Sequence, residues 1–223
     1  MVTVLTEPHG THRGLVRGGS SRAQASTWQS GNLVQARWVA RLADQLGSIT
    51  AELVHPGAAL AMDDALSLAI LSSACAVAEG ALPEREPHPR VFAGLVQLIA
   101  GLGRGADALT DLVRWEGALL AELGYGLDLS SCAVSGVTSG LAWVSPKTGR
   151  AVSDAAAGEW RDRLLRLPGF LVGANTASVE DWRDGLKLTG HFLARDAFGQ
   201  QHRPLPAARD MLYDRITALA AAS

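Results

Sequence analysis

The chain of 223 residues has little lysine and little cysteine, and each shortage excludes a class of protein. Lysine occurs only at Lys147 and Lys187, so arginine carries almost all of the positive charge, and the formal net charge is −2. A chain with this balance does not attract nucleic acid over its whole surface, so any such surface must be local. The two cysteines, Cys75 and Cys132, are too few for the disulfide framework of a small secreted protein.

Long hydrophobic segments are also missing. The most apolar stretch, residues 66–77, is too short to cross a bilayer and is flanked by acidic residues. The N-terminus lacks the basic segment and apolar core that mark a signal peptide. We therefore expect a cytoplasmic protein, and the hydrophobic content of 48% is typical of a folded globular chain.

Motifs of catalysis are absent from the sequence. It contains no G-x-S-x-G, no P-loop and no G-x-G-x-x-G that follows a strand, and the glycines at 101, 103 and 105 lie between two expected helices. Glu7, His9 and His12 form an E-x-H-x-x-H pattern that a metal could use, but Pro8 and Gly10 place it in a turn. We expect no enzyme and no cofactor.

The hydrophobic pattern changes near residue 55. Before it, short β-branched runs alternate with glycine-rich turns, and Val34, Ala36 and Trp38 alternate with polar residues as in a half-buried strand. This pattern of short strands and turns predicts a small barrel or sandwich over residues 1–56. Beyond it, the period becomes helical, which predicts a helical domain over residues 57–223 with two short strands within 141–153. Helices are expected over residues 58–82, 89–102, 106–123, 153–165, 178–198 and 207–219.

Several longer motifs carry a resemblance to a known family. They read VTVLTEPHGTHRGLVRGG, QSGNLVQARW, LPEREPHPRVF, LGYGLDLSSCAVSG and WVSPKTGRAVS, and they follow one another over almost the whole chain. In this the sequence resembles the RecO family of bacterial recombination mediators. The resemblance implies an α+β protein, with an N-terminal β-barrel of the OB-fold type and a mainly helical second domain. The family has a further strand before the segment matching VTVLTEPHG, so we expect a barrel without its first strand.

The resemblance also implies a zinc-ribbon-like insertion, here at about residues 130–156. Many family members carry two C-x-x-C pairs in it, and zinc needs about four nitrogen or sulfur ligands. The matching positions are Cys132 and Ser135, then Ser153 and Ala156. Only one thiol is left, so we expect no metal and an insertion held by packing. The packing residues we expect are Trp143, Val144 and Pro146.

The first domain has a local excess of arginine, and OB-folds bind single strands through a cationic groove with aromatic stacking platforms. We therefore expect phosphate contacts from Arg13, Arg17, Arg22 and Arg37. Trp28 and Trp38 are candidates for base stacking, and the alternative is that both lie in the core of the barrel.

The resemblance further implies that the helical domain receives the acidic-aliphatic C-terminal tail of single-stranded-DNA-binding protein (SSB). Such a tail requires an apolar surface rimmed by cations. The candidates are Arg114, Lys187, Leu188, Phe192 and Arg195. The alternative is that Arg114 is solvated and the others belong to the core.

By resemblance, the expected function is DNA repair and recombination. A family member binds single-stranded DNA and SSB, anneals complementary strands, and with RecR assists loading of RecA on the DNA of the nucleoid. A second hypothesis is a helical protein-interaction module that no longer binds DNA. A third is a small metal-dependent hydrolase that uses His9 and His12.

Overall fold

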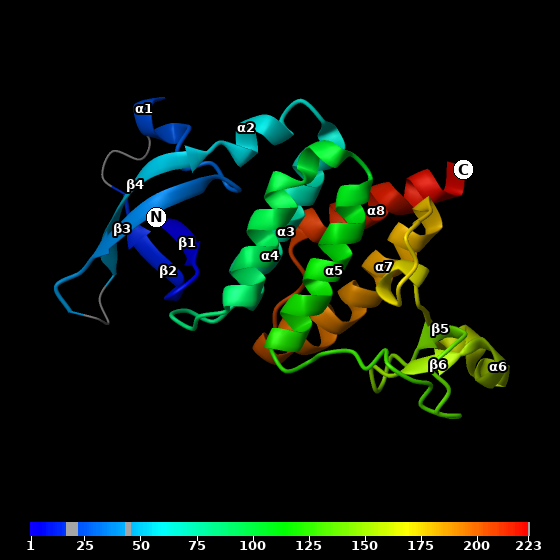
Figure 1. The fold of residues 1–223 in the computed structure, drawn as a ribbon. Helices are drawn as coiled ribbons and strands as arrows, with labels where there is room; N and C mark the ends of the chain where they lie inside the picture. Colours follow the sequence, from blue (N-terminus) through cyan, green and yellow to red (C-terminus); the bar gives the residue numbers. More distant parts are fainter. Residues whose placement is uncertain (17–21, 43–45, 223) are drawn as a thin grey trace. The chain divides into compact units, whose positions relative to one another are not determined.

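A computed structural model describes residues 1–16, 22–42 and 46–222 of the chain (Figure 1). They form two compact units, Met1–Gly105 and Ala106–Ser223. Strands dominate the first part of the chain and helices the rest, so the expected α+β class is confirmed. The domain boundary after residue 56 stays a prediction. No helix of the described ranges is long and apolar enough to span a membrane.

The N-terminal sheet contains β1 (Val2–Thr6), β2 (Gly10–Leu15), β3 (Leu33–Val39) and β4 (Gly47–His55), in the order β1-β2-β4-β3. β1 and β2 form an antiparallel hairpin, as do β3 and β4, while β2 and β4 run parallel over two residue pairs. Over the described residues this sheet is open, with β1 and β3 as its edges. Closure into a barrel therefore stays a prediction.

Helices complete the first unit. The short α1 (Arg22–Ala25) precedes β3, and α2 (Gly57–Ala61), α3 (Ala65–Ala81) and α4 (Pro89–Ala100) follow β4. The single helix expected over residues 58–82 is wrong, because the chain starts a new helix at Asp64. The Asp64 carboxylate accepts hydrogen bonds from the backbone N–H groups of Leu66 and Ser67, which caps α3. Thr3 donates to Glu79 at 3.0 Å and so joins β1 to α3.

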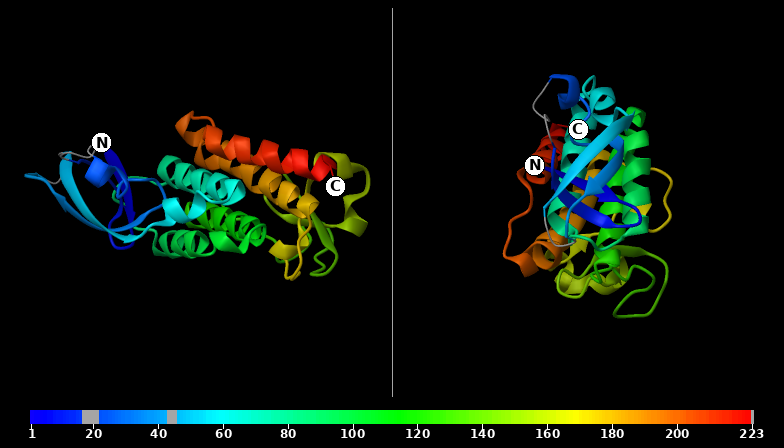
Figure 2. Two further views of the ribbon diagram at one scale, coloured as in Figure 1. Left: turned by 90° about the horizontal axis from the view of Figure 1, so that it is seen from above. Right: turned by 90° about the vertical axis from the view of Figure 1, so that its left-hand side faces the viewer.

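The second unit is built on α5 (Asp107–Glu122), α7 (Val179–Phe192) and α8 (Ala207–Ala222). α7 packs against both of the others, and Figure 2 shows it alongside α8. α5 ends where expected, since Gly124 adopts a φ of 86° that favours glycine. The predicted cap of α7 is confirmed, because Ser178 and Asp181 form a reciprocal capping box. The close approach of α7 to α5 depends on Gly185, where a Cβ would lie 3.1 Å from the Val113 side chain of α5.

A small β module lies between α5 and α7 in the sequence. It consists of β5 (Leu141–Val144), β6 (Ala151–Ser153) and β7 (Leu165–Arg166), with β5 in the centre. The two strands expected within residues 141–153 are confirmed, and β7 is an addition. The helix expected over residues 153–165 is wrong beyond α6 (Asp154–Ala157), because Gly158 takes a φ of 47° and a 3₁₀ turn follows.

A charged pair is buried in the second unit. Glu116 on α5 and Arg209 on α8 are 0% and 1% exposed. The Arg209 guanidinium donates to both carboxylate oxygens of Glu116 and to the Leu186 carbonyl, while the Thr189 hydroxyl donates to the same carboxylate. This network joins α5, α7 and α8, and every charged group in it has a partner.

Candidate functional site

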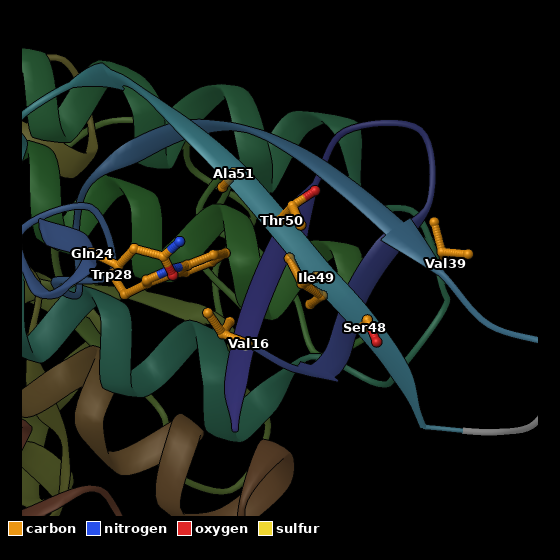
Figure 3. A pocket seen from close by; sticks show the side chains of 8 residues that line it. All are labelled: Val16, Gln24, Trp28, Val39, Ser48, Ile49, Thr50 and Ala51. Atoms are coloured by element: carbon orange, nitrogen blue, oxygen red, sulfur yellow. The ribbon is translucent and has the colours of Figure 1, made fainter. Parts of the chain in front are cut away.

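A pocket of about 310 Å³ lies along β4 (Figure 3). β2 pairs with β4 only as far as Ser48, and beyond that point residues 48–51 form one wall of the pocket. Val16, Gln24 and Trp28 form the opposite wall. Trp28 is half-buried, so part of its ring faces solvent. The volume is at the lower end of the range for pockets that bind small organic groups. Sequence reasoning did not find Gln24 or Thr50, because they are ordinary polar residues with no motif around them.

Arg37 lies beside this pocket. It pairs with Thr50 across the β3–β4 ladder, and Thr50 lines the pocket. Side chains that are directly opposite in an antiparallel ladder share a face and lie about 5 Å apart. Arg37 is exposed, and among the described residues no carboxylate forms an ion pair with it. One predicted tryptophan, Trp28, therefore lines the pocket, and one predicted arginine, Arg37, lies opposite Thr50 in its lining.

The other arginines predicted to contact phosphate in this unit are either paired with a carboxylate or have side chains outside the described part of the chain. The Arg13 Nε atom lies 3.0 Å from a carboxylate oxygen of Glu84, and both side chains are 44% exposed. That carboxylate partly neutralises the charge that Arg13 could offer to a phosphate. Arg17 lies outside the described residues. Arg22 begins α1, and its side chain also lies outside the described part.

Trp38 packs within the sheet. Its indole N–H donates to the Arg13 carbonyl at 3.2 Å, and its ring makes an edge contact with His12 at 5.4 Å between centroids. A Cβ at Gly47 would lie 2.4 Å from the indole nitrogen, so the backbone of β4 also touches this side chain. Both tryptophans considered for base stacking are half-buried, and of the two only Trp28 lines the pocket along β4.

The histidines of the E-x-H-x-x-H pattern lie near each other. The ring centroids of His9 and His12 are 6.3 Å apart, and the second ring also contacts Trp38. Within residues 1–16, 22–42 and 46–222, no three histidine, cysteine or acidic side chains gather into a group that could hold a metal ion. Glu7 is exposed in the turn before them.

Arg114 is an exposed residue of α5. Its guanidinium donates to the Phe170 carbonyl at 3.1 Å and lies 5.9 Å from the centroid of the Phe170 ring. The ring packs where α5 and α7 meet, since a Cβ at Gly185 would contact both Phe170 and Val113. Arg114 therefore presents a positive charge at the seam between the two helices.

Arg195 follows the C-terminal end of α7. It donates to the carbonyls of Pro146 and Lys147, and it forms a two-pronged ion pair with Asp196. Hydrogen bonding to Asp196 raises the pKa of Arg195 above its ordinary value, so it stays charged. Lys187 is exposed on α7, whereas Leu188 and Phe192 are 0% and 1% exposed. A tail could contact Leu188 and Phe192 only after these helices move.

Two family models match successive parts of the chain. The family model described as "Recombination protein O N terminal" matches residues 1–56, and the model described as "Recombination protein O C terminal" matches residues 62–204. The chain belongs to the RecO family. It is 60% identical to the DNA repair protein RecO of Granulibacter bethesdensis, over 98% of this chain and 89% of that protein. It is 59% identical to the protein of the same name from Gluconacetobacter diazotrophicus, with the same coverage. RecO proteins act in DNA repair and recombination.

The four positions matched to the RecO zinc ligands converge in the β module. The Cys132 sulfur accepts hydrogen bonds from the backbone N–H of Ser135 at 3.4 Å and from the backbone N–H and hydroxyl of Ser153 at 3.3 and 3.5 Å. Ala156 packs on the apolar cluster that contains Cys132 and Trp143. These neighbours are hydrogen-bond donors or a methyl group, so the four positions do not fit a zinc ion.

The hydrogen bonds at Cys132 replace the interaction that a metal would make with its sulfur. Burial raises the pKa of the Cys132 thiol, but the hydrogen bonds from Ser135 and Ser153 outweigh it and lower the pKa to about 6. Trp143 and Val152 pack against this cysteine, which agrees with the packing role expected of Trp143. The module is therefore closed by apolar contacts and by hydrogen bonds to one thiol.

Proposed function

We propose that this chain is a recombination mediator that binds single-stranded DNA and the SSB tail. In this role it anneals complementary strands and, together with RecR, assists RecA loading on the DNA of the cytoplasmic nucleoid. The observation that carries the proposal is the match to both RecO family models, at residues 1–56 and 62–204. Binding and alignment of strands need no catalytic group, so we propose no enzymatic activity.

The pocket along β4 supports the DNA-binding part of this proposal. A base inserted beside Trp28 would stack on an accessible ring, and Arg37 would face the adjoining phosphate. Stacking tolerates any base, because every base has a flat π face, and phosphate contacts carry no sequence information. Such a site suits a protein that acts on many sequences. Neutralised phosphates also repel each other less, which favours annealing of two strands.

We predict that Arg37→Ala weakens binding to single-stranded DNA and lowers its salt dependence. Each phosphate contact to a single strand contributes about 0.7 to the slope of log K against log salt, so the slope should fall by about that amount. Arg13→Ala should change it less, because Glu84 already pairs with Arg13. The measurement is fluorescence anisotropy of a labelled oligothymidylate at several salt concentrations.

Arg90→Ala is the matched control, because Arg90 is exposed on α4 away from the pocket-lining residues. No binding of the unaltered chain at low salt would remove DNA contact from the proposed function and would favour a protein-interaction module. Equal slopes for the unaltered chain and Arg37→Ala would instead exclude Arg37 while leaving DNA binding in place.

The second unit supports the SSB part of the proposal. Arg114 contacts Phe170 at Gly185, and Arg195 follows ten residues after Gly185 in the sequence. At about 1.5 Å per helical residue this separation is roughly 15 Å, which an extended peptide of about five residues spans. Exposed Lys187 lies between them in the sequence. An acidic tail could therefore meet these cations along α7, and it would reach the buried Leu188 and Phe192 only if these helices move.

We predict that Arg114→Ala weakens binding of a labelled acidic-aliphatic tail peptide by about tenfold, and that Arg195→Ala weakens it less, because Asp196 already pairs with Arg195. The reason is that a hydrogen bond to a charged group contributes about 1.5 kcal/mol or more. Titration by anisotropy measures the loss, and circular dichroism checks that both variants fold. Arg150→Ala is the control, because Arg150 pairs with Asp128 in the β module. Unchanged peptide affinity in both variants would place the tail elsewhere.

A further inference from the structure

An exposed tryptophan in the β module has no role in the site described above. Trp160 lies in the 3₁₀ turn between α6 and β7, and 56% of its surface is exposed. Burying a tryptophan is strongly favourable, and large aromatic side chains are enriched where a protein binds another molecule. The guanidinium of Arg163 lies over this ring at 5.3 Å from its centroid.

A second arginine–tryptophan contact involves Arg166, three residues after Arg163 in the sequence. Trp143 on β5 is directly opposite Arg166 on β7, and the Arg166 guanidinium lies 4.4 Å from the Trp143 ring centroid. Arg161 also lies over Trp143, at 5.5 Å, and it forms an ion pair with Asp154 at 3.0 Å. Within the described residues, no carboxylate forms an ion pair with Arg163 or Arg166, and both are exposed.

Contact with a tryptophan ring holds an arginine in a position from which it can bind phosphate. A guanidinium that lies over a ring is held in place, yet the N–H groups at the edge of the guanidinium remain able to donate. Arg163 and Arg166 therefore offer donors to two neighbouring phosphates. The exposed part of Trp160 offers a flat surface on which an unpaired base can stack.

Charge and shape favour a nucleic acid over a protein as the occupant. Residues 158–166 contain three arginines and two carboxylates, a small positive excess that suits a polyanion bound jointly by charge and stacking. A peptide side chain gains most from a concave apolar pocket, whereas a base gains from a flat ring open on one face. The positive excess and the open tryptophan ring both belong to protein side chains and need no metal in the module.

We propose that Trp160, Arg163 and Arg166 form a second contact for single-stranded nucleic acid, in which Trp160 stacks a base and the two arginines bind phosphates. This inference rests on the proposed DNA-binding function and adds a site outside the N-terminal sheet.

The test is anisotropy of a labelled oligothymidylate with the full chain and two sets of variants. Trp160→Ala should lower affinity about 5- to 100-fold while the salt slope stays the same, because stacking releases no counterions. The double variant Arg163→Ala/Arg166→Ala should lower the slope by about 1.4, which corresponds to two phosphates. Trp160→Phe should retain part of the affinity. Binding should also quench tryptophan fluorescence, and Trp160→Phe should remove part of that quenching.

Two controls match these variants. Met211→Ala removes another exposed apolar side chain, on α8, and Arg150→Ala/Arg183→Ala removes two arginines that already pair with Asp128 and Asp184. If the unaltered chain binds DNA and Trp160→Ala binds equally well, this inference is overturned and the proposed function stands. If Trp160→Ala weakens binding of a hexaglutamate peptide but leaves DNA binding unchanged, the surface belongs to a protein partner and the inference is also overturned. If the unaltered chain fails to bind at low salt, both are overturned.

Discussion

Arg209→Met is expected to destabilise the second unit by about 3–5 kcal/mol, because it leaves the Glu116 carboxylate charged and buried without its partner. The Thr189 hydroxyl would still donate to that carboxylate, but one hydroxyl does not replace a guanidinium that donates to both of its oxygens. Urea unfolding followed by circular dichroism measures the change. For a chain of this size, the melting temperature should fall by roughly 6–20 °C.

Two further variants identify the cause of this loss. Arg150→Met removes an arginine from a surface pair with Asp128, in which both side chains are nearly half exposed, and should cost about 1 kcal/mol or less. The double variant Glu116→Leu/Arg209→Met removes both buried charges and should be more stable than Arg209→Met alone. If the double variant loses as much stability as the single variants Glu116→Leu and Arg209→Met combined, the pair contributes through packing rather than through charge.

This network also indicates which features of the fold the sequence could predict. Local signals succeeded where one short segment decides the structure, as with the Gly124 end of α5 and the Ser178 cap of α7. Nothing local marks Glu116 as buried, because its partner Arg209 lies 93 residues further along the chain. Hydrophobic periodicity therefore identified α5 but could not identify the charge within its buried face.

The two wrongly predicted helices, over residues 58–82 and 153–165, also have local causes. The break before α3 arises because the Asp64 side chain competes for backbone N–H groups, and a count of apolar residues does not detect it. The segment after α6 has helical periodicity, but Gly158 leaves the helical region and Leu165–Arg166 pairs with β5 instead. That pairing stacks Arg166 on Trp143, so the sequence prediction of a helix there could not find the surface around Trp160.

The candidate site could be predicted only in part. The arginine excess and the tryptophans pointed to the N-terminal sheet, where Trp28 lines a pocket and Arg37 lies opposite Thr50 in its lining. The pattern could not distinguish Arg37 from Arg13, because the ion pair with Glu84 depends on contacts between the sheet and the loop before α4. Nor could it distinguish exposed Lys187 from buried Leu188, which occupy adjacent positions on one helix.

Restoring three thiols to the β module is expected to create a metal site that the natural sequence does not fit. The Cys132 sulfur lies 3.5 Å from the Ser153 hydroxyl, and in a tetrahedral site with bonds of 2.3 Å the sulfur atoms lie about 3.8 Å apart. These two positions therefore already have nearly the spacing that zinc needs. We predict that Ser135→Cys/Ser153→Cys/Ala156→Cys binds one cobalt or zinc ion, with the visible absorption of tetrahedral cobalt.

Zinc should then raise the melting temperature of this triple variant, because a ligand that binds only the folded state at about 1,000 times its Kd adds roughly 4 kcal/mol of stability. The unaltered chain should show neither effect, since three of the four positions lack a thiol. Ser135→Cys/Ser153→Cys is the matched control; it lacks the fourth thiol and should bind more weakly. Stoichiometric zinc in the unaltered chain would contradict the view that hydrogen bonds and apolar packing around Cys132 hold the module without a metal. A triple variant that folds but binds no cobalt would contradict the ligand geometry expected of the four positions.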